Sequence, residues 1–524
     1  MNKKFLFGLF AGLLLFSTTY GQTEPMKTAD RLKMWKDSLN LTSAQLEKLW
    51  AIEKEYNPEF DTVKFDGVFD AAKAREHTRQ MKIKEVLTEK QQIRLAQMEE
   101  NERKVQGQTA STQTKAKETN GFPSYNTNPL PPDKTGVEHT AIEIAKQMGL
   151  GWNLGNSFEA IKYVPDETRD DGVWRKTSGK EYPDESFETA WGNPEVTHLI
   201  TDGVYKAGFN VLRIPCGWDL YVYDTVNAKI PDFWLARVKK TIDSCLNRHP
   251  DMYVMLNIHY DGGWLETNCN PDMQEINNKK QKAYWEQIAT YFRDYNDHLL
   301  FAACNEPNVH NEVQMKVLAS YEQTFVDAVR STGGKNYYRT LIIQGPSTDI
   351  DESKRLFYAM PKDVVEGRLM FEVHYYTPWN FAGMTEDADW GHMFYYWGER
   401  NLNPKDPYRC PTYGDLNFMK EHFGMMKEMF VDKGIPVVLG EYACNRKEFS
   451  DTLIQRLHNQ SRLDWDYEVT KNALEYGMIP VYWDNGAMRE PTMGIFNRLN
   501  GKPFDQEVVD VIMKAGREAN KYWK

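Results

Sequence analysis

The chain has 524 residues, of which 41% are hydrophobic and 27% charged, so it can bury a sizeable core and is not a disordered protein. Its 64 Lys and Arg residues against 75 Asp and Glu residues leave a net charge of −11. This acidity argues against a nucleic-acid partner or an anionic membrane surface, because both need a positive field. With 15 Trp and 28 Tyr residues, the chain has more flat amphipathic rings than a core requires, which favours carbohydrate binding.

The first residues have the pattern of a secretory signal peptide. Asn2-Lys3-Lys4 is positive, residues 5–16 are apolar, and Thr19-Tyr20-Gly21 fits a small-x-small cleavage site. The apolar run is too short to span a bilayer, and no Cys follows it for a lipid anchor. We therefore expect cleavage near Gly21 and export to the periplasm or the extracellular medium, with no membrane anchor.

Residues 26–105 are predicted to form a small all-α domain. Apolar residues recur at helical spacing in two stretches, and each stretch contains the same start signal. The two signals are Leu41-Thr42-Ser43-Ala44-Gln45 and Leu87-Thr88-Glu89-Lys90-Gln91. A Thr followed three residues later by Gln is a capping box, which satisfies free N–H groups at a helix start.

The repeated Leu-Thr-x-x-Gln motif resembles that of the periplasmic stress proteins and chaperones of the Spy/CpxP type. This resemblance implies an unfolded protein or another protein as a partner of the helical domain. It also favours the periplasm over the extracellular medium. The alternative is a helical spacer whose Thr and Gln residues only cap helices.

Residues 106–135 are rich in Thr, Ser, Gln, Asn and Pro and have almost nothing to bury, so we expect a linker. The six cysteines form no CxxC or zinc pattern. Cys216 and Cys304 lie in apolar, strand-like runs and are expected to be free thiols. Cys269 and Cys410 lie in loop-like segments next to prolines, which makes them the best candidates for a disulfide in an exported protein.

From residue 136 to residue 524, short apolar runs alternate with amphipathic helical stretches, which predicts parallel βα units. Eight such units over this length fit an α/β fold, a (β/α)8 TIM barrel, preceded by the small helical domain. The predicted strands are Met148–Asn153, Asn210–Ile214, Tyr253–His259, Leu299–Asn305, Arg339–Gln344, Leu369–His374, Pro436–Glu441 and Ile479–Trp483.

Most of these runs end in a polar or charged residue, and the C-terminal ends of barrel strands converge on one rim, where active sites are built. Two of the residues are carboxylates, Glu306 and Glu441, which follow the fourth and seventh strands. Two carboxylates on one rim suit hydrolysis of a glycosidic bond. Zinc clusters, phosphate loops and nucleophile elbows are absent from the sequence, so we expect no cofactor and no metal.

The same strand ends carry motifs by which the domain resembles glycoside hydrolase family 5, the cellulase-type family of clan A. In chain order these are Gly151-Trp152-Asn153-Leu154-Gly155-Asn156, Arg213-Ile214-Pro215, Asn257-Ile258-His259, Asn305-Glu306-Pro307, His374-Tyr375-Tyr376, Gly440-Glu441-Tyr442 and Trp483. The segment Glu188–Pro194 also resembles members that act on β-1,4-glucans. Where many relatives carry a second histidine after His259, this chain has Tyr260.

The resemblance implies a retaining mechanism with Glu441 as the nucleophile and Glu306 as the acid/base. The substrate-binding residues that it implies are Asn153, Arg213, His259, Tyr260, Trp264, Asn305, His374, Tyr376, Trp379 and Trp483, with Trp191 as a further platform. The substrate would be a β-linked polysaccharide or oligosaccharide. Endo-β-1,4-glucanase is the first expectation; endo-β-mannanase, xyloglucanase and mixed-linkage glucanase activities stay open, as does a non-catalytic carbohydrate-binding barrel.

Overall fold

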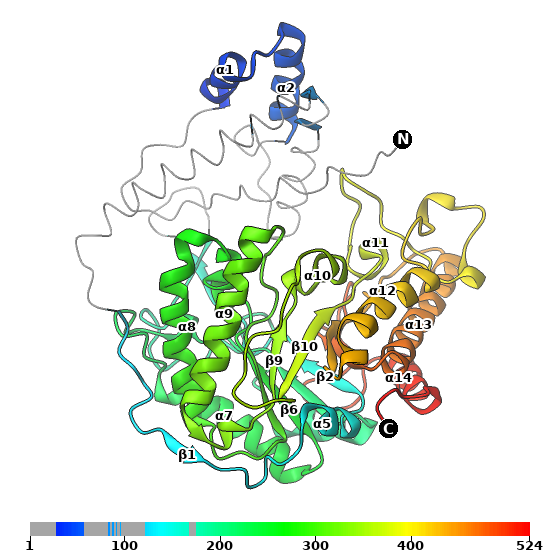
Figure 1. The fold of residues 1–524 in the computed structure, drawn as a ribbon. Helices are drawn as coiled ribbons and strands as arrows, with labels where there is room; N and C mark the ends of the chain where they lie inside the picture. The colour runs from blue at the N-terminus through cyan, green and yellow to red at the C-terminus, as the bar shows by residue number, and fades with distance from the viewer. Residues whose placement is uncertain are drawn as a thin grey trace. The chain divides into compact units, whose positions relative to one another are not determined.

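The computed structural model describes residues 28–56, seven positions between 82 and 95, residues 121–166 and residues 174–524. The predicted signal peptide and residues 106–120 of the predicted linker lie outside these ranges. Contacts divide the chain into two units, with the main boundary between Asn120 and Gly121. Figure 1 shows helices α1 and α2 of the first unit and the barrel of the second.

The first unit contains α1 (Thr28–Leu39) and α2 (Ser43–Tyr56). Its two Leu-Thr-x-x-Gln motifs are joined by hydrogen bonds. Gln45 and Thr42 form the predicted capping box, with bonds of 3.0 and 3.2 Å, and Gln91 Oε1 accepts the N–H of Thr88 at 2.9 Å. Gln45 Nε2 also donates to Gln91 Oε1 at 2.9 Å, and Gln91 Nε2 donates to the carbonyl of Leu39 at 3.1 Å. The glutamines therefore link the two motifs as well as cap them.

The second unit is a closed barrel of eight parallel strands, as predicted. Each predicted strand overlaps an observed one. In barrel order, the strands are β2 (Gly151–Leu154), β5 (Val211–Ile214), β6 (Tyr253–Asn257), β7 (Leu299–Ala302), β9 (Leu341–Gln344), β10 (Leu369–His374), β11 (Val437–Tyr442) and β12 (Met478–Asp484). The barrel closes between β12 and β2, where Val481 pairs with Gly151 and Asp484 with Leu154.

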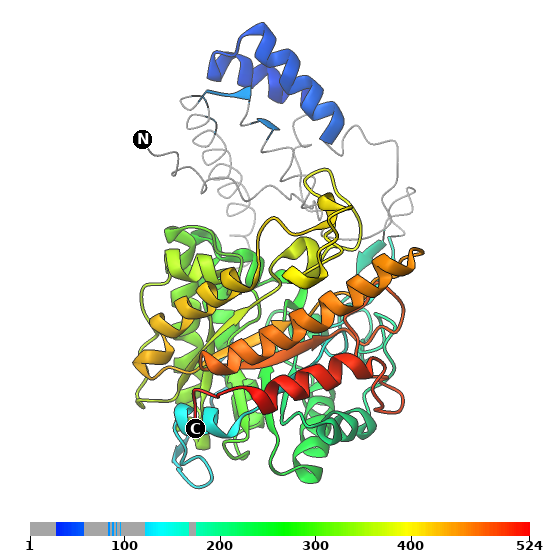
Figure 2. The ribbon, with the colours of Figure 1, turned by 90° about the vertical axis from the view of Figure 1, so that its right-hand side faces the viewer.

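Helices cover the outside of the barrel, and α13 and α14 run along one side (Figure 2). The helices of this unit are α5 (Ala141–Gln147), α6 (His198–Ala207), α7 (Asp232–Arg248), α8 (Pro271–Tyr291), α9 (Glu312–Ser331), α10 (Ile350–Leu356), α11 (Trp379–Ala382), α12 (Leu416–Met429), α13 (Thr452–Glu475) and α14 (Gln506–Glu518). Side chains before the helices cap their N-termini: Asn270 accepts from Met273 N at 3.2 Å, and Asn311 accepts from Gln314 N at 3.0 Å. Among the described residues, none of the helices has the length and apolarity needed to cross a membrane.

The inside of the barrel is apolar at its lower end. Val211, Met255, Leu300 and Ile342 come from different strands and pack together with Ile144 of α5. This helix precedes the first strand, so its apolar face closes the bottom of the barrel. Because side chains alternate along a strand, the same inward row continues upward to the rim, where polar residues replace the apolar ones.

Residues 121–135, which the composition assigns to the linker, pack onto the barrel. Strand β1 (Leu130–Pro132) pairs with β8 (Gly333–Gly334), and Glu286 of α8 accepts the backbone N–H of Tyr125 at 2.7 Å. Because of these contacts, the barrel unit begins earlier in the chain than the composition indicates.

A second small sheet joins β3 (Tyr163–Pro165) and β4 (Trp174–Lys176).

Cys269 and Cys410, the best candidates for a disulfide, form none, because all six cysteines are free thiols. Cys269 is buried in an apolar cluster with Leu265 and Cys304. Cys410 is half-buried, and its Sγ lies 3.6 Å from the carbonyl oxygen of Asp406. Composition placed both residues in loops, but their environments are set by packing with segments distant in sequence.

Candidate active site

The rim of the barrel carries the polar residues because the inward rows of the strands change character towards their C-terminal ends. In β5 the buried Val211 is followed two positions later by Arg213. In β10 the order is Met370, Glu372 and His374, again with alternate positions on one face. The site therefore lies directly above the apolar filling of the barrel, and its side chains are anchored in strands rather than in loops.

Glu441 reaches the interior through an irregularity in β11. Residue pairing with β10 shifts, so that Leu439 faces Val373 but Glu441 faces His374, and Gly440 is the extra residue of a β-bulge. A Cβ atom on Gly440 would lie 1.9 Å from Glu372 Oε1. Only glycine permits this close approach, and the bulge turns the next side chain towards the centre of the site.

The carboxylate of Glu441 is buried and held from two sides. Arg213 Nη1 donates to its Oε1 at 3.0 Å, and the hydroxyl of Tyr376 donates to its Oε2 at 3.0 Å. Burial raises the pKa of Glu441, while the positive charges of His374 and Arg213 lower it. These contacts favour the ionised form in a position where desolvation alone would favour the acid.

Arg213 is the centre of this network. Its Nη1 also donates to Asn153 Oδ1 at 2.9 Å, and its Nη2 donates to Asn305 Oδ1 at 2.7 Å. The same Nη2 lies 3.0 Å from Oε1 of Glu372. The predicted residues Asn153, Arg213 and Asn305 are thus brought together with the nucleophile candidate by one buried guanidinium.

Glu372 is a residue that sequence reasoning missed. It is fully buried, it lies between Arg213 and His374, and Gln344 Nε2 donates to its Oε2 at 2.6 Å. Burial raises the pKa of Glu372, but the charge of Arg213 and the bonds from His374 and Gln344 hold it below its usual value. A charged residue inside the apolar run of β10, two positions before His374, was the available signal.

His374 stands between the two candidate catalytic carboxylates. Its Nδ1 lies 2.7 Å from Glu306 Oε1 and 3.7 Å from Glu441 Oε2, and its Nε2 lies 3.3 Å from Glu372 Oε1. Burial lowers the pKa of His374, but the carboxylates, Glu441 first, raise it to about 10. The ring is therefore an imidazolium at neutral pH, and it reduces the repulsion between the carboxylates.

One nitrogen of His374 and one oxygen each of Glu306 and Glu441 lie within 4.8 Å of one another. This is a spacing that a metal ion could use, although the metal would have to displace the proton of the His374 imidazolium. The same spacing matches the short separation of carboxyl groups in retaining glycosidases, about 5–5.5 Å, and not the longer one of inverting enzymes. The geometry therefore suits double displacement at a sugar carbon.

Glu306 has a different environment from Glu441, because its side chain is 46% exposed. The loop that carries it is held from behind by Glu266, a second residue that sequence reasoning missed. Glu266 is buried, its Oε1 accepts the N–H of Asn305 at 2.7 Å, and its carbonyl oxygen accepts the N–H of Asn308 at 2.8 Å. Burial raises the pKa of the Glu266 carboxyl to about 8.

His259 and Tyr260 follow strand β6 at the rim. The His259 ring is stacked on Trp483, with ring centroids 5.6 Å apart and an interplanar angle of 12°. Burial and then the charge of Arg213 lower the pKa of His259 well below its usual range, so the ring is neutral. Tyr260 has φ of +49°, and its backbone N–H donates to Glu266 Oε1 at 3.1 Å. The turn after β6 is thus fastened to the same carboxyl group as the Glu306 loop.

The predicted aromatic platforms differ in what surrounds them. Trp483 lies half-buried on the rim, and Trp379 is 39% exposed and packs edge-on against Tyr376 at 6.0 Å. Trp191 is 40% exposed. Trp264 donates its Nε1 to Asp261 at 2.9 Å and has the Lys280 ammonium 4.6 Å from its ring centroid. These contacts make Trp264 the least suited of the four to stack on a sugar.

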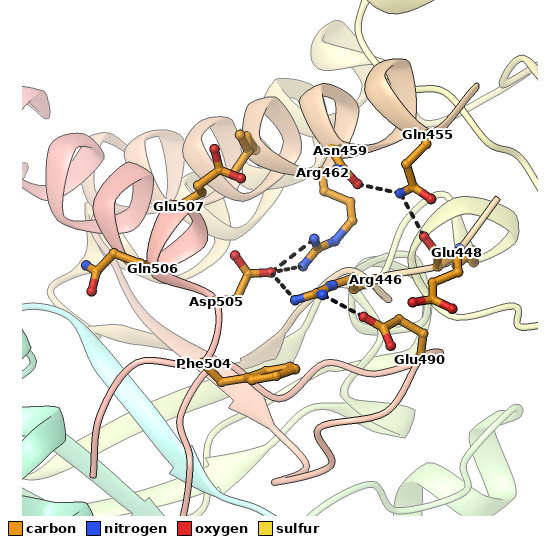
Figure 3. A pocket seen from close by; sticks show the side chains of 12 residues that line it. Arg446, Glu448, Gln455, Asn459, Arg462, Glu490, Phe504, Asp505, Gln506 and Glu507 are labelled. Atoms are coloured by element: carbon orange, nitrogen blue, oxygen red, sulfur yellow. Dashed lines mark hydrogen bonds and ion pairs between the residues drawn. The ribbon is translucent and has the colours of Figure 1, made fainter. Parts of the chain in front are cut away.

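A cavity of about 400 Å³ lies elsewhere, between α13 and the start of α14 (Figure 3). Its charged side chains bind one another: Arg446 lies 2.7 Å from Glu490 and 3.8 Å from Asp505, which also pairs with Arg462 at 3.2 Å. Its two arginines are already paired, and the paired carboxylates of the candidate site lie on the barrel rim instead.

Comparison with known proteins assigns the barrel to a family. The family model for cellulase, glycosyl hydrolase family 5, matches residues 176–489, which include Glu306 and Glu441. The xyloglucan-specific endo-β-1,4-glucanase of Bacteroides ovatus is 32% identical over 397 residues, covering 74% of this chain and 72% of that protein. An endoglucanase A of Paenibacillus barcinonensis is also 32% identical, covering 76% of this chain and 94% of its own length.

Solved structures agree with the sequence matches. The Bacteroides ovatus family 5 xyloglucanase in complex with a heptasaccharide superposes with a TM-score of 0.66 at 30% identity, covering 76% of this chain and 81% of the other. A xyloglucan-specific β-1,4-glucanase from a ruminal metagenomic library has a TM-score of 0.64 at 33% identity, covering 74% and 98%. The chain therefore belongs to glycosyl hydrolase family 5.

Proposed function

We propose that this chain is an endo-β-1,4-glucanase that hydrolyses β-glucans with retention of configuration. One observation carries the proposal: oxygens of Glu306 and Glu441 lie within 4.8 Å of each other on the rim, with Glu441 buried and Glu306 partly open to solvent. Two carboxyl groups in such different environments suit two different roles.

In the first step, an oxygen of Glu441 attacks the anomeric carbon and forms a glycosyl ester. The bond from that carbon to the leaving oxygen breaks, and Glu306 gives its proton to the departing sugar. Arg213 and Tyr376 hold Glu441 ionised and aimed before attack. Asn305, fixed by Arg213, is placed to bind the sugar 2-hydroxyl, and Trp483 stacks beneath the ring at the cleavage point.

In the second step, Glu306 takes a proton from water while the water oxygen attacks the same carbon. The ester bond breaks, Glu441 leaves as a carboxylate, and Glu306 is again protonated. The His374 imidazolium lies close to both carboxylates in each state, so it stabilises negative charge on whichever one carries it.

Xyloglucan is a second candidate for the preferred substrate. Curated and solved relatives are named endoglucanases and xyloglucanases, at similar identities to this chain. Xyloglucan, a branched β-1,4-glucan, therefore stands beside unbranched cellulose-type chains as a substrate. Mannan and mixed-linkage glucan follow because the same catalytic machinery serves them.

The test is viscosity loss and reducing-sugar release from carboxymethyl-cellulose, barley β-glucan, xyloglucan, glucomannan and galactomannan. The wild type is compared with Glu306→Gln and Glu441→Gln. Rapid viscosity loss on glucans that both substitutions abolish supports the proposal, and NMR of the first product shows whether configuration is retained. Activity confined to mannans would overturn the substrate, and inactivity on every polymer would leave a carbohydrate-binding barrel.

Export and a role for the helical unit also remain proposals. The N-terminal pattern ending near Gly21 supports export to the periplasm or beyond, which cell fractionation and N-terminal sequencing test. The paired Leu-Thr-x-x-Gln motifs support a protein-binding unit. Light scattering of a denaturing client protein, with and without the full chain, distinguishes a chaperone-like unit from a spacer.

A further inference from the structure

The long connection after strand β2 contains the small antiparallel sheet of β3 and β4. Tyr163 lies opposite Lys176, and Pro165 lies opposite Trp174. Opposite residues, and residues two apart, share one face of a sheet. Tyr163, Pro165, Trp174 and Lys176 therefore form one face, which we call the hairpin face, while Arg175 belongs to the other.

The hairpin face is directed towards the active-site rim. Lys176 Nζ donates to the carbonyl of Gly262 at 3.2 Å, in the turn that follows His259. The phenol of Tyr163 is close enough to that of Tyr260 to raise its pKa, after the larger effect of burial. On the opposite face, Arg175 makes two hydrogen bonds to Glu181, at 3.0 and 2.7 Å. Hydrogen bonds to the rest of the barrel unit therefore hold both faces of the sheet.

Two large rings on this face are open to solvent. Tyr163 is 47% exposed and Trp174 is 62% exposed, and neither belongs to a hydrophobic core cluster of the described chain. Exposed rings contribute little to folding, but they stack well on the C–H face of a sugar. The charged side chains of the sheet are engaged with the protein itself, so the face suits a neutral ligand.

The position of the face indicates which sugar it meets. Another part of the same connection carries Trp191, and its neighbour Asn193 donates to the carbonyl groups of Asn156 and Asn485, at 2.8 and 3.0 Å. The segment that carries Trp191 is therefore tied to the turns after β2 and β12, and β12 carries Trp483, where we place the glucan backbone. The hairpin face is tied instead to the tip of β6 and lies at the flank of that path.

We propose that the hairpin face is a binding site for a sugar branch of a substituted β-1,4-glucan. This inference rests on the proposed function for the location of the backbone. A branch leaving the backbone beside Trp483 reaches the Tyr163 and Trp174 rings, whereas an unbranched chain passes them. The site therefore favours branched over unbranched glucans without touching the reacting atoms.

The test is calorimetric binding to the full chain carrying Glu441→Gln, which removes the nucleophile and so prevents turnover. The probes are a xyloglucan heptasaccharide with xylosyl branches and unbranched cellotetraose. Adding Trp174→Ala or Tyr163→Ala is expected to raise the Kd of the branched probe about 3- to 10-fold each and that of cellotetraose less than twofold. Trp174→Phe, which keeps a ring, should restore part of the loss.

Tyr358→Ala is the matched control, because Tyr358 is 61% exposed and lies after the end of α10. It should leave both Kd values unchanged. An equal loss for both probes, or no loss for either, would overturn the branch site. The proposed function is tested by a separate measurement, and it fails if the wild type hydrolyses no glucan. The Kd values test the branch site independently of that assay.

Discussion

The two sides of the active site each carry a glutamate, but the two side chains have opposite environments. On one side, Glu441 is buried at a bulge in β11 and bound by Arg213 and Tyr376. On the other, the Glu306 side chain is 46% exposed, and the loop that carries it is held through its backbone by Glu266. A nucleophile needs a fixed, ionised carboxylate, whereas an acid/base must exchange protons with water in every cycle.

The comparison teaches that the two carboxylates are held differently. Side chains contact both oxygens of Glu441, whereas Glu306 contacts His374 and lies on a loop whose backbone Glu266 holds. Burial raises the pKa of Glu441, and the charges of His374 and Arg213 oppose that rise. Glu306 also contacts the charged ring of His374, but its side chain is partly open to solvent, so it can exchange a proton with water. His374 lies close to both carboxylates and connects the two sides.

The largest expected effect is the loss of activity when either carboxylate is replaced, and its dependence on the leaving group of the substrate distinguishes the two residues. Glu441→Gln should reduce hydrolysis by about 10⁴-fold or more for every substrate, because no ester can form. Glu306→Gln should cost about 10²- to 10⁴-fold on glucans but much less in the first step with a dinitrophenyl cellobioside, whose leaving group needs no proton. Pre-steady-state release of dinitrophenol measures that step. Equal losses in both variants would contradict the assigned roles.

Arg213→Lys should lower kcat strongly, because it disrupts the hydrogen bonds around Glu441. A single ammonium cannot serve Asn153, Asn305, Glu372 and Glu441 together, so kcat should fall about 10²-fold for glucans and aryl cellobiosides alike. Steady-state kinetics and thermal unfolding check this. Arg339→Lys is the control, because Arg339 is also buried but donates to backbone carbonyl groups such as that of Leu299. A similar loss of kcat in the control would point to general destabilisation.

Glu266→Ala should affect the Glu306 side alone. It removes the acceptor of the Asn305 and Tyr260 N–H groups, so we expect about a 10-fold loss of kcat on glucans and little loss with the dinitrophenyl substrate. Glu266→Gln keeps an acceptor and should lose less than about threefold.

Glu286→Ala is the matched control for this substitution. Glu286 is a buried carboxylate that accepts the N–H of Tyr125 on the outside of the barrel. Its loss should lower the melting temperature without any dependence on the leaving group. If Glu266→Ala slows both substrates equally, the residue is structural and does not position the acid/base.

The smallest expected effect is a shift in pH dependence. Burial raises the pKa of Glu441 and the Tyr376 bond lowers it, so Tyr376→Phe should raise it further. Glu441 must be ionised, so activity is present above its pKa in the folded enzyme and is lost as pH falls through it. The acid limb of kcat/KM should move to higher pH, with a smaller change at alkaline pH. A shift of the alkaline limb instead would place the effect of Tyr376 on Glu306.

Strand-end motifs predicted the residues around Glu441, but they did not predict the buried residues that hold the site in place. Asn153, Arg213 and Tyr376 were named from strand-end motifs, and all three belong to the network around Glu441. Glu372 and Glu266 were not named, because neither ends a strand. Their importance comes from burial and from partners on other strands, which spacing along the chain does not reveal.

The sequence by itself determined the number and order of the strands and the polar rim, and it named the two candidate carboxylates on that rim. These follow from alternation along strands and from the rule that parallel strands end at one edge. Tertiary structure alone decided the spacing of the carboxylates, the inward turn at Gly440, the free thiols and the orientation of the hairpin face. Each of these depends on closure of the barrel, which brings together atoms from segments far apart in the chain, and local patterns carry no distances between such segments.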